Sequence, residues 1–366
     1  MFIGVGAPQG AVPASRRRGR GAGLNPSGRF EAFQRESVDD GWESVAELPA
    51  FKTDVTVETP RRIITRNDSP DISFDRSINP YRGCEHGCVY CFARPTHAHM
   101  GLSPGLDFET RLFAKPDAPD LLEKELAAKG YQPRVIAIGT NTDPYQPIER
   151  QHRIMRRVLE VLDRHSHPVG IVTKSALVLR DLDILTRMAE RDLVKVAVSV
   201  TTLDPKLARR MEPRAAAPHR RLQTIETLAA AGVPTAAMVA PIVPAISDHE
   251  IETILERVAA AGAREAGYVL LRLPHEVKDL FSAWLEEHYP DRAAKVMSIM
   301  QSMRGGKAYD AAWGQRMTGT GPSAWAIGRR FQMAITRQKL NRIQTNLRLD
   351  LFSPPASDSR QLALFA

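Results

Sequence analysis

The sequence predicts an α/β fold that contains a partial barrel of six parallel strands. Six runs rich in Val, Ile and Leu, with little polar alternation, recur along the chain and are typical of parallel strands buried on both faces. Segments with helical periodicity lie between these runs, and this alternation indicates repeated strand and helix units. A length of 366 residues accommodates one such barrel with further segments at both ends.

The expected elements follow one another in a regular order. An edge strand is expected near Val55 to Ile64, and the first barrel strand ends just before Asn79. Functional side chains should follow each strand, because the carboxyl ends of the strands form the active side of a parallel barrel. The remaining strands are expected at 135–138, 169–172, 194–200, 233–239 and 267–271, and the helices at 120–129, 148–165, 179–191, 218–231 and 248–261.

The ends of the chain differ in composition from the barrel. Residues 1–54, rich in Gly, Pro, Ser and Arg, are expected to form a disordered basic arm, and residues 55–290 form the barrel. A basic helical extension is expected over residues 291–348, with its helix starting near Ser323 and ending near Leu347. Residues 349–366 are expected to form a flexible tail.

The composition restricts the class of protein. The net charge of +8 favours polyanionic partners, and a hydrophobic share of 43% allows a large core. No apolar run approaches the roughly 18 residues that a membrane span needs, and the first residues do not resemble a secretory signal. The 3 cysteines lie together and offer no disulfide framework, which fits a reducing compartment. We therefore expect a soluble, cytoplasmic protein.

The cysteines are the strongest functional signal. Cys84, Cys88 and Cys91 are the only cysteines in the sequence, and they lie within eight residues. Three thiolates are one fewer than a closed four-iron cluster takes, so one iron would keep an open coordination position. The alternatives are a zinc site or unrelated buried thiols, but neither His86 nor His97 completes a common zinc pattern.

This cysteine spacing, with Tyr90 and Phe92 on either side of the last cysteine, resembles the radical S-adenosylmethionine (SAM) superfamily. The resemblance implies a (β/α)6 partial barrel and a 4Fe-4S cluster held by Cys84, Cys88 and Cys91. It also implies that the fourth iron binds S-adenosylmethionine, that cleavage yields a 5'-deoxyadenosyl radical, and that a flavodoxin or ferredoxin donates the electron.

Polar and small side chains follow the predicted strands and could form a cofactor cradle. The second strand is followed by Thr140, Asn141 and Thr142, which could bind an amino acid head group or form an ordinary turn. After later strands, Lys174 could pair with the methionyl carboxylate and Ser199 could bind a ribose hydroxyl. Adenine could rest on the apolar residues that end the fifth strand, Pro241 and Ile242.

Several segments narrow the resemblance to the spore photoproduct lyase and DNA repair photolyase-like branch, and to an uncharacterised group within it. They are residues 88–94, the Thr-Asn-Thr-Asp block at 140–143, and the Met-Glu-Pro-Arg segment at 211–214. The resemblance implies a nucleic acid substrate. Thr140 stands where spore photoproduct lyase has its hydrogen-donor cysteine, so that exact activity is not expected. By matched position, the expected contacts of S-adenosylmethionine are Tyr90, Phe92, Thr142, Lys174 and Ser199.

The last residues resemble a short peptide with which bacterial DNA repair proteins bind the sliding clamp; the residues concerned are Gln361, Leu362, Leu364 and Phe365. A tail that packs on its own domain is the alternative. Two other functions stay open at this point. One is RNA or peptide modification by the same barrel, since fold does not fix substrate. The other is a non-catalytic iron-sulfur protein that binds nucleic acid or senses redox state.

Overall fold

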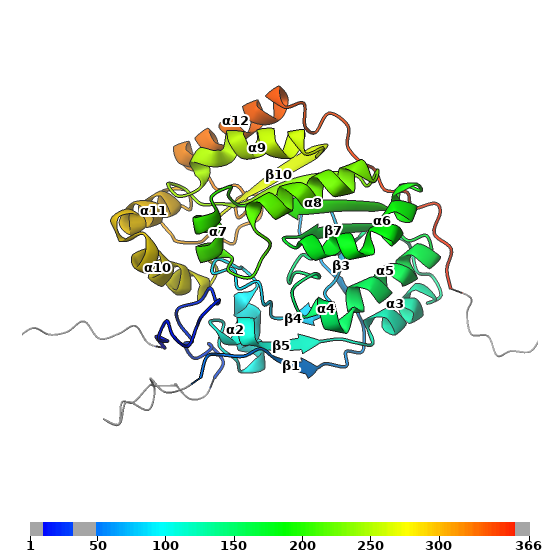
Figure 1. Cartoon of the computed structure of the whole chain (residues 1–366), viewed down its shortest axis with the longest axis horizontal. Coiled ribbons are helices and arrows are strands. Elements are labelled where there is room, and N and C mark those ends of the chain that lie inside the picture. The colour runs from blue at the N-terminus through cyan, green and yellow to red at the C-terminus, as the bar shows by residue number, and fades with distance from the viewer. Residues whose placement is uncertain (1–9, 32–48, 356–366) are drawn as a thin grey trace, which may run out of the picture.

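The computed structural model describes residues 10–31 and 49–355. Within these residues the main sheet has seven strands, in the order β10-β9-β8-β7-β6-β3-β2 (Figure 1). Neighbouring strands are parallel except β2, which pairs antiparallel with β3 at one edge. The predicted α/β partial barrel of parallel strands is confirmed. Its strands are β2 (Ile64–Arg66), β3 (Arg76–Ile78), β6 (Ile136–Ile138), β7 (Val169–Thr173), β8 (Val194–Ser199), β9 (Thr235–Ile242) and β10 (Glu265–Leu270).

Helices connect the parallel strands and pack against the sheet (Figure 1). The predicted helix over 148–165 is divided into two, because Arg153 adopts a left-handed φ of 50°. At this break the buried Glu149 carboxylate accepts the Met155 N–H at 3.1 Å and replaces a backbone acceptor. The connecting elements are α3 (Ala118–Leu126), α4 (Glu149–His152), α5 (Ile154–Arg164), η2 (Ala176–Asp181), α6 (Leu182–Ala189), α7 (Pro205–Met211), α8 (Pro218–Ala230), η3 (Asp248–Glu250) and α9 (Ile251–Ala260).

A second, smaller sheet supports the cysteines, and the sequence pattern predicts only one of its strands. Among the described residues its order is β1-β5-β4, and its strands are too short to show periodicity. Strand β4 comes directly after β3 in the chain. The loop over residues 83–93, here called the cysteine loop, connects β4 to η1. The elements are β1 (Asp54–Val57), β4 (Tyr81–Arg82), η1 (Arg94–Met100), α2 (Asp107–Thr110) and β5 (Arg111–Ala114).

The C-terminal extension links the two edges of the partial barrel. The Leu270 N–H in edge strand β10 donates to Met317 O at 2.9 Å. Near the other edge, the Gly314 N–H donates to Asp71 at 2.6 Å, and Arg316 pairs with the same carboxylate. The segment over residues 309–317 is called the strap below. The helices of the extension are α10 (Val277–His288), α11 (Pro290–Ser302) and α12 (Gly321–Arg337), so the last helix ends earlier than predicted.

The expected disorder over residues 1–54 does not hold for residues 10–31. This N-terminal segment lies between α10 and α2 (dark blue in Figure 1). Ala22 is fully buried, and the N–H groups of Gly21 and Ala22 donate to Glu109 of α2 at 2.9 and 2.8 Å. The composition of this segment is typical of disorder. The segment is ordered because it forms hydrogen bonds to Glu109, although it has no apolar periodicity.

The start of the C-terminal tail also packs on the barrel. The Phe352 ring lies 5.5 Å from the Tyr131 ring and 5.4 Å from the His167 ring, measured between centres. The Ser353 N–H donates to His165 O at 2.9 Å. This part of the expected flexible tail is therefore folded against the core. The predicted clamp-binding residues lie outside the described residues: Gln361, Leu362, Leu364 and Phe365.

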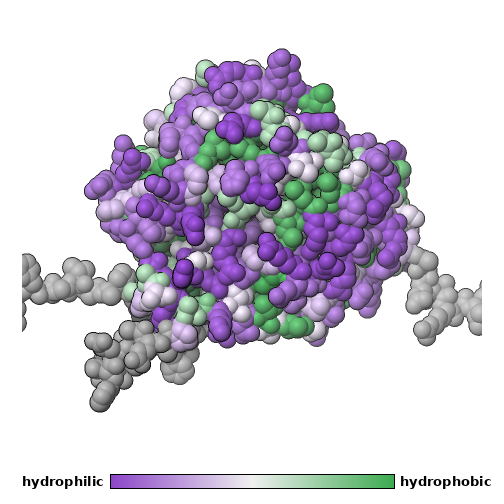
Figure 2. Space-filling view, in the orientation of Figure 1, coloured by the Kyte–Doolittle hydropathy of each residue, from purple (hydrophilic) through white to green (hydrophobic). Residues whose placement is uncertain are grey.

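The apolar side chains gather mainly between the sheet and its helices. Figure 2 shows that hydrophilic side chains dominate one face of the molecule, with small apolar patches among them. In the described part of the chain, every helix is too short or too polar to cross a bilayer.

The buried His167 makes stability depend on pH. Its Nδ1 lies 3.0 Å from Pro168 O, which can only accept, so Nδ1 carries the proton. The neutral ring then accepts the Tyr131 O–H at Nε2, at 2.8 Å. Burial lowers the pKa of His167 from 6.5 to about 4. Between these values the unfolded chain binds a proton that the folded chain does not, so this group's contribution to stability is lost as pH falls. We expect it to lower the free energy of unfolding by about 1.4 kcal/mol per pH unit.

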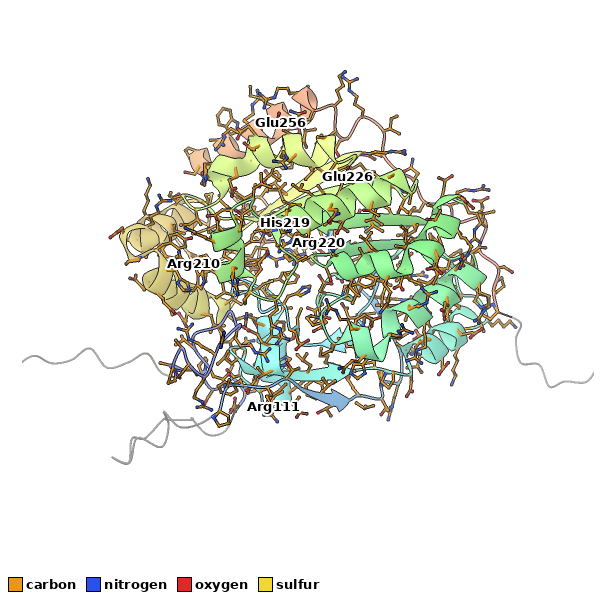
Figure 3. All side chains as sticks on the ribbon, in the orientation of Figure 1. Arg111, Arg210, His219, Arg220, Glu226 and Glu256 are labelled. Carbon is orange, nitrogen blue, oxygen red and sulfur yellow. The ribbon has the colours of Figure 1, made fainter. Side chains whose placement is uncertain are left out.

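Urea denaturation between pH 7 and pH 4 measures this slope. The substitution His167→Gln removes the titrating ring and should flatten the slope. His219→Gln is the matched control, because His219 is exposed at the start of α8 (Figure 3). Equal slopes in the wild type and H167Q would contradict the expectation.

Candidate active site

The cysteine loop is folded tightly over α2. Gly83 and Gly87 have φ angles of 73° and 67°, a left-handed conformation that favours glycine. A Cβ atom on Gly87 would lie 2.7 Å from Oε2 of the buried Glu109, so a larger side chain would clash. The Cys84 N–H donates to Phe108 O at 2.9 Å. These contacts set the backbone path of the loop.

Cys84 and Cys88 are buried, and Cys91 is partly exposed. Burial raises the pKa of Cys84, Cys88 and Cys91 above the ordinary value of 9.0. The ammonium group of Lys174 acts in the opposite direction and lowers the pKa of Cys88 and Cys91. The thiols are therefore neutral at pH 7 in the metal-free protein, and they must lose their protons when they bind metal.

This donor set suits an iron-sulfur cluster. In a four-iron cluster each thiolate binds a different iron, so three thiols satisfy three irons and leave the fourth open. A single zinc ion instead needs several ligands that converge on one point. Across the described residues, no group of three or more His, Cys, Asp or Glu side chains is arranged to hold one metal ion.

A buried ion pair holds one side of the cysteine loop. The Arg94 guanidinium pairs with the Glu109 carboxylate, and neither side chain is exposed. Arg94 also donates to Cys88 O at 2.9 Å and to Gly105 O at 2.7 Å. Because both charges are removed from water, the pair is stable only while these hydrogen bonds are complete. Arg94 therefore fixes the backbone at the second cysteine.

The Met-Glu-Pro-Arg segment, residues 211–214, holds the other side of the loop. The Val89 N–H donates to Met211 O at 3.0 Å, and the Arg214 N–H donates to His86 O at 3.3 Å. The segment thus contacts the loop backbone on either side of the second cysteine.

Glu212 of this segment is the centre of a buried polar network. Its carboxylate accepts the Tyr90 O–H and, at 2.8 Å, the Thr201 O–H. Arg221 pairs with Glu212 and donates to Ser199 O at 3.1 Å. Burial raises the pKa of Glu212, and Arg221 partly offsets this effect. The network positions the ring beside the last cysteine and connects it to the end of β8.

Asp143 connects the cysteine loop to the end of β7. It accepts the Thr173 O–H and the Lys174 N–H, each at 2.7 Å, and lies 3.4 Å from Nδ1 of His86. Burial alone would raise the pKa of Asp143, but His86 and these hydrogen bonds outweigh burial and lower it to about 2. The carboxylate is therefore ionised at pH 7 and fixes the backbone at Lys174.

Comparison with known proteins identifies the family. The profile of the radical SAM superfamily matches residues 78–258, from the end of β3 through α9. The chain belongs to the radical SAM superfamily. An uncharacterized protein of Mycobacterium tuberculosis is 36% identical over 230 residues, which cover 62% of this chain and 68% of that protein. One from Methanocaldococcus jannaschii is 27% identical over 215 residues, covering 58% and 76%.

Solved structures show the same fold. Spore photoproduct lyase complexed with a dinucleoside spore photoproduct aligns with a TM-score of 0.56 at 17% identity, over 77% of this chain and 79% of that one. At this identity the likeness concerns the fold alone. The prediction of a radical SAM enzyme is confirmed, and so is the predicted likeness of its fold to spore photoproduct lyase.

The structure of this radical SAM enzyme places several predicted cofactor-binding residues at the carboxyl ends of neighbouring strands. Lys174 follows β7, and its Nζ lies 5.9 Å from the centre of the Tyr90 ring. Ser199 ends β8, whereas Pro241 and Ile242 lie at the end of β9. These residues share one edge of the sheet because the strands are parallel. Their contacts with S-adenosylmethionine stay predictions.

The other predicted cofactor-binding residues differ in exposure. Thr142 is buried after β6, and its O–H donates to Tyr81 O at 2.9 Å. Thr140 and Asn141, next to it, are partly exposed. Phe92 is 43% exposed, and the Arg272 guanidinium lies 4.9 Å from the centre of its ring. Thr142 therefore supports the start of the cysteine loop, whereas Phe92 lies at the surface beside the end of β10.

The sequence alone does not indicate which groups hold the cysteine loop in place. Arg94 and Glu109 belong to short elements without periodicity, so no local signal indicates that they meet. Asp143 lies inside the polar block after β6, which the strand-end rule does single out. The role of Glu212 depends on a contact with Tyr90, far away in the sequence, and only the family resemblance points to its segment.

Proposed function

We propose that this radical SAM enzyme holds a 4Fe-4S cluster at Cys84, Cys88 and Cys91 and acts on nucleic acid, in lesion repair or base modification. The bound cluster would supply the electron, received from a flavodoxin or ferredoxin, that cleaves S-adenosylmethionine to a 5'-deoxyadenosyl radical. One observation supports this proposal most strongly. The three thiols lie in one loop beyond the carboxyl end of the first barrel strand, and the ammonium group of Lys174 lies 5.9 Å from the centre of the Tyr90 ring in the same loop.

The side chains at the strand ends have the chemistry that S-adenosylmethionine requires. Lys174 would pair with the methionyl carboxylate as a point charge. Ser199 would bind a ribose hydroxyl, and Pro241 with Ile242 would provide an apolar surface for adenine. The Tyr90 hydroxyl donates to Glu212, so its ring is held in a fixed position for the ligand.

Removing Lys174 tests this assignment. Lys174→Ala should raise the Kd of the cluster-loaded protein for S-adenosylmethionine by about 10- to 100-fold, because a charged hydrogen bond contributes about 1.5 to 3 kcal/mol. Equilibrium dialysis under anaerobic conditions measures the Kd. Lys206→Ala, at an exposed position on α7, is the control and should bind like the wild type. Unchanged binding by K174A would contradict the assigned role.

Aromatic and cationic side chains near the strand ends support a nucleic acid substrate. Arg272 contacts the rings of both Phe92 and Tyr309, at 4.9 and 5.8 Å from their centres. Trp313, in the strap, is 57% exposed. Exposed aromatic rings stack on unpaired bases, and cations neutralise the phosphates between them.

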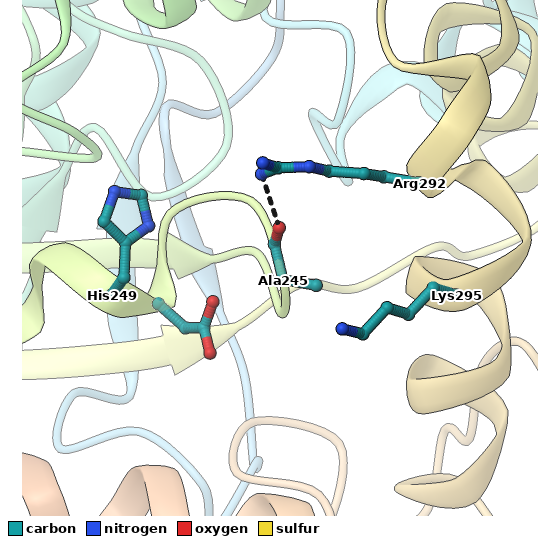
Figure 4. A pocket seen from close by; sticks show the side chains of 5 residues that line it. Ala245, His249, Arg292 and Lys295 are labelled. Atoms are coloured by element: carbon teal, nitrogen blue, oxygen red, sulfur yellow. Dashed lines mark hydrogen bonds between the residues drawn. The ribbon is translucent and has the colours of Figure 1, made fainter.

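A pocket beyond the end of β9 adds further cations near the same edge. Its volume is about 410 Å³, and Arg292 and Lys295 project into it from α11 towards the loop that carries Ala245 and His249 (Figure 4). The Arg292 guanidinium donates to Ala245 O at 3.2 Å. The remaining lining residue, Asp248, carries one negative charge against these two cations. This balance favours an anionic substrate.

The substrate is proposed to differ from that of spore photoproduct lyase. The solved structure of that enzyme holds a dinucleoside spore photoproduct. Thr140 occupies the position expected for its donor cysteine, and an O–H group is a poor donor of hydrogen atoms. We therefore favour another lesion or a base modification.

Substrate trials separate this proposal from RNA or peptide modification. The reduced, reconstituted enzyme would be incubated with S-adenosylmethionine and deuterated pools of damaged DNA, RNA or peptides. We expect deuterium to appear in 5'-deoxyadenosine with a nucleic acid pool. Transfer from the peptide pool alone would contradict the proposal.

A further inference from the structure

We infer that the protein has a second binding site, for a phosphate-bearing anion, along the edge strand β2. A cavity of about 620 Å³ lies there between β2, the start of β3 and α3. Five of its lining residues are cationic and one is aromatic: Arg61, Arg62, Arg66, Arg76, Lys124 and Tyr131. The proposed function uses none of them.

The position of Arg76 separates the two sites. Arg76 is the first residue of β3, whereas the cysteine loop follows the last residue of that strand by way of β4. Tyr131 likewise precedes β6, whose far end carries Thr140 and Asn141. The inner wall of the cavity, formed by Arg76 and Tyr131, is therefore at the amino ends of the parallel strands, whereas the cofactor residues are at the carboxyl ends. Arg61 and Arg62 precede β2, which runs antiparallel to β3 at the edge of the sheet.

Four of the five cations of the cavity have no ion pair with the described part of the protein. Arg61, Arg62, Arg66 and Lys124 are exposed, and none of them forms an ion pair with any residue that the structure describes. Glu125 is the acidic residue of the lining, and its Oε1 accepts the N–H groups of residues 63 and 64 at 2.5 and 3.3 Å. The lining therefore carries an excess of positive charge, which a bound anion would relieve.

Arg76 gives the cavity a rigid inner wall. It is only 5% exposed, and its guanidinium lies 5.1 Å from the centre of the Tyr131 ring. It donates to Gln132 O, but its Nε has no hydrogen-bond partner among the described residues. The nearest carboxylate oxygen to Nε, on Asp75, is 3.7 Å away. A buried cation with incomplete hydrogen bonding is costly, so this site favours an acceptor from outside.

The shape and charge of the cavity fit phosphate better than carboxylate. Guanidinium groups bind phosphate with two parallel N–H donors, and three or more arginines can surround a tetrahedral dianion from different directions. A planar carboxylate presents its two oxygens in one plane and carries less charge. The phosphates can belong to a free nucleotide or to the backbone of a nucleic acid, and both offer the same chemistry to these side chains.

Binding assays on the full-length protein test the site. The probes are inorganic pyrophosphate, ATP and a 12-nucleotide single-stranded DNA, each measured by titration calorimetry at fixed salt. The test variant is R61Q/R62Q/R66Q, which removes three exposed charges and leaves the buried Arg76 in place. The control variant is K206Q/R257Q/R264Q, which removes three exposed charges elsewhere.

We expect the test variant to bind pyrophosphate about tenfold or more weakly than the wild type, since each lost charged hydrogen bond contributes 1.5 kcal/mol or more. The control should bind as the wild type does. Equal weakening of ATP binding would identify a free nucleotide as the ligand, and selective weakening of DNA binding would identify the nucleic acid backbone. Unchanged binding of all three probes, or equal weakening in the control variant, would overturn the inference.

Discussion

Replacing Cys88 with Ala is expected to abolish cluster assembly and all cleavage of S-adenosylmethionine. A thiolate that holds one iron has no substitute here, because the sequence contains only 3 cysteines, all in one loop. The reconstituted wild type should hold about four irons per chain, and the variant should hold close to none. Iron analysis, visible absorbance and electron paramagnetic resonance measure the cluster, and chromatography measures 5'-deoxyadenosine.

Thr96→Ala is the matched control for this loss. Thr96 lies a few residues beyond the last cysteine, and its hydroxyl donates a hydrogen bond to Ala93 O at 2.7 Å. The T96A variant should keep its iron and its activity. Full iron content in C88A would contradict the assignment of Cys88 as a ligand. An equal loss of iron in T96A would mean that the loop responds to any substitution.

Glu109→Ala is expected to destabilise the folded protein by about 3 to 5 kcal/mol, because it leaves the buried Arg94 without its counter-charge. The same carboxylate accepts the N–H groups of Gly21 and Ala22, so the N-terminal segment also loses its attachment. Urea denaturation of the metal-free protein measures the effect without any contribution from the cluster. Because Arg94 also holds Cys88 O, we expect slower cluster assembly as well.

Glu123→Ala serves as the control for an exposed ion pair. Glu123 pairs with Arg164 at 2.9 Å, and both side chains are substantially exposed. Its Oε1 also lies 3.3 Å from Nε2 of His165. Its loss should cost less than about 1 kcal/mol. The conservative variant Glu109→Gln keeps a hydrogen-bond acceptor and should be less destabilised than E109A. A cost for E109A as small as that for E123A would show that the buried pair does not hold the loop.

The sequence predicts the barrel well because most of its parallel strands are apolar runs, such as Ile136–Ile138, between amphipathic helices. The break at Arg153 escapes prediction because a side chain, Glu149, replaces a backbone acceptor there. The order of the N-terminal segment escapes prediction for a related reason. Its glycines and arginines are typical of a linker, but the Glu109 carboxylate accepts the backbone N–H groups of Gly21 and Ala22.

The candidate site likewise has residues that the sequence indicates and contacts that it does not indicate. The strand-end rule singles out Lys174 and Ser199, because parallel strands bring their carboxyl ends together. It cannot indicate that Tyr90 donates to Glu212 or that His86 lies beside Asp143, since these contacts join segments that are far apart along the chain. The sequence thus indicates which edge of the sheet carries the functional residues. It does not indicate as readily which side chains position them.

The most direct test of the account is whether the purified chain cleaves S-adenosylmethionine. The full-length protein would be reconstituted with iron and sulfide without oxygen, reduced with dithionite and incubated with S-adenosylmethionine. We expect 5'-deoxyadenosine from the wild type and T96A, and none from C88A. A wild-type protein that holds its cluster yet releases no 5'-deoxyadenosine, with or without nucleic acid, would contradict it.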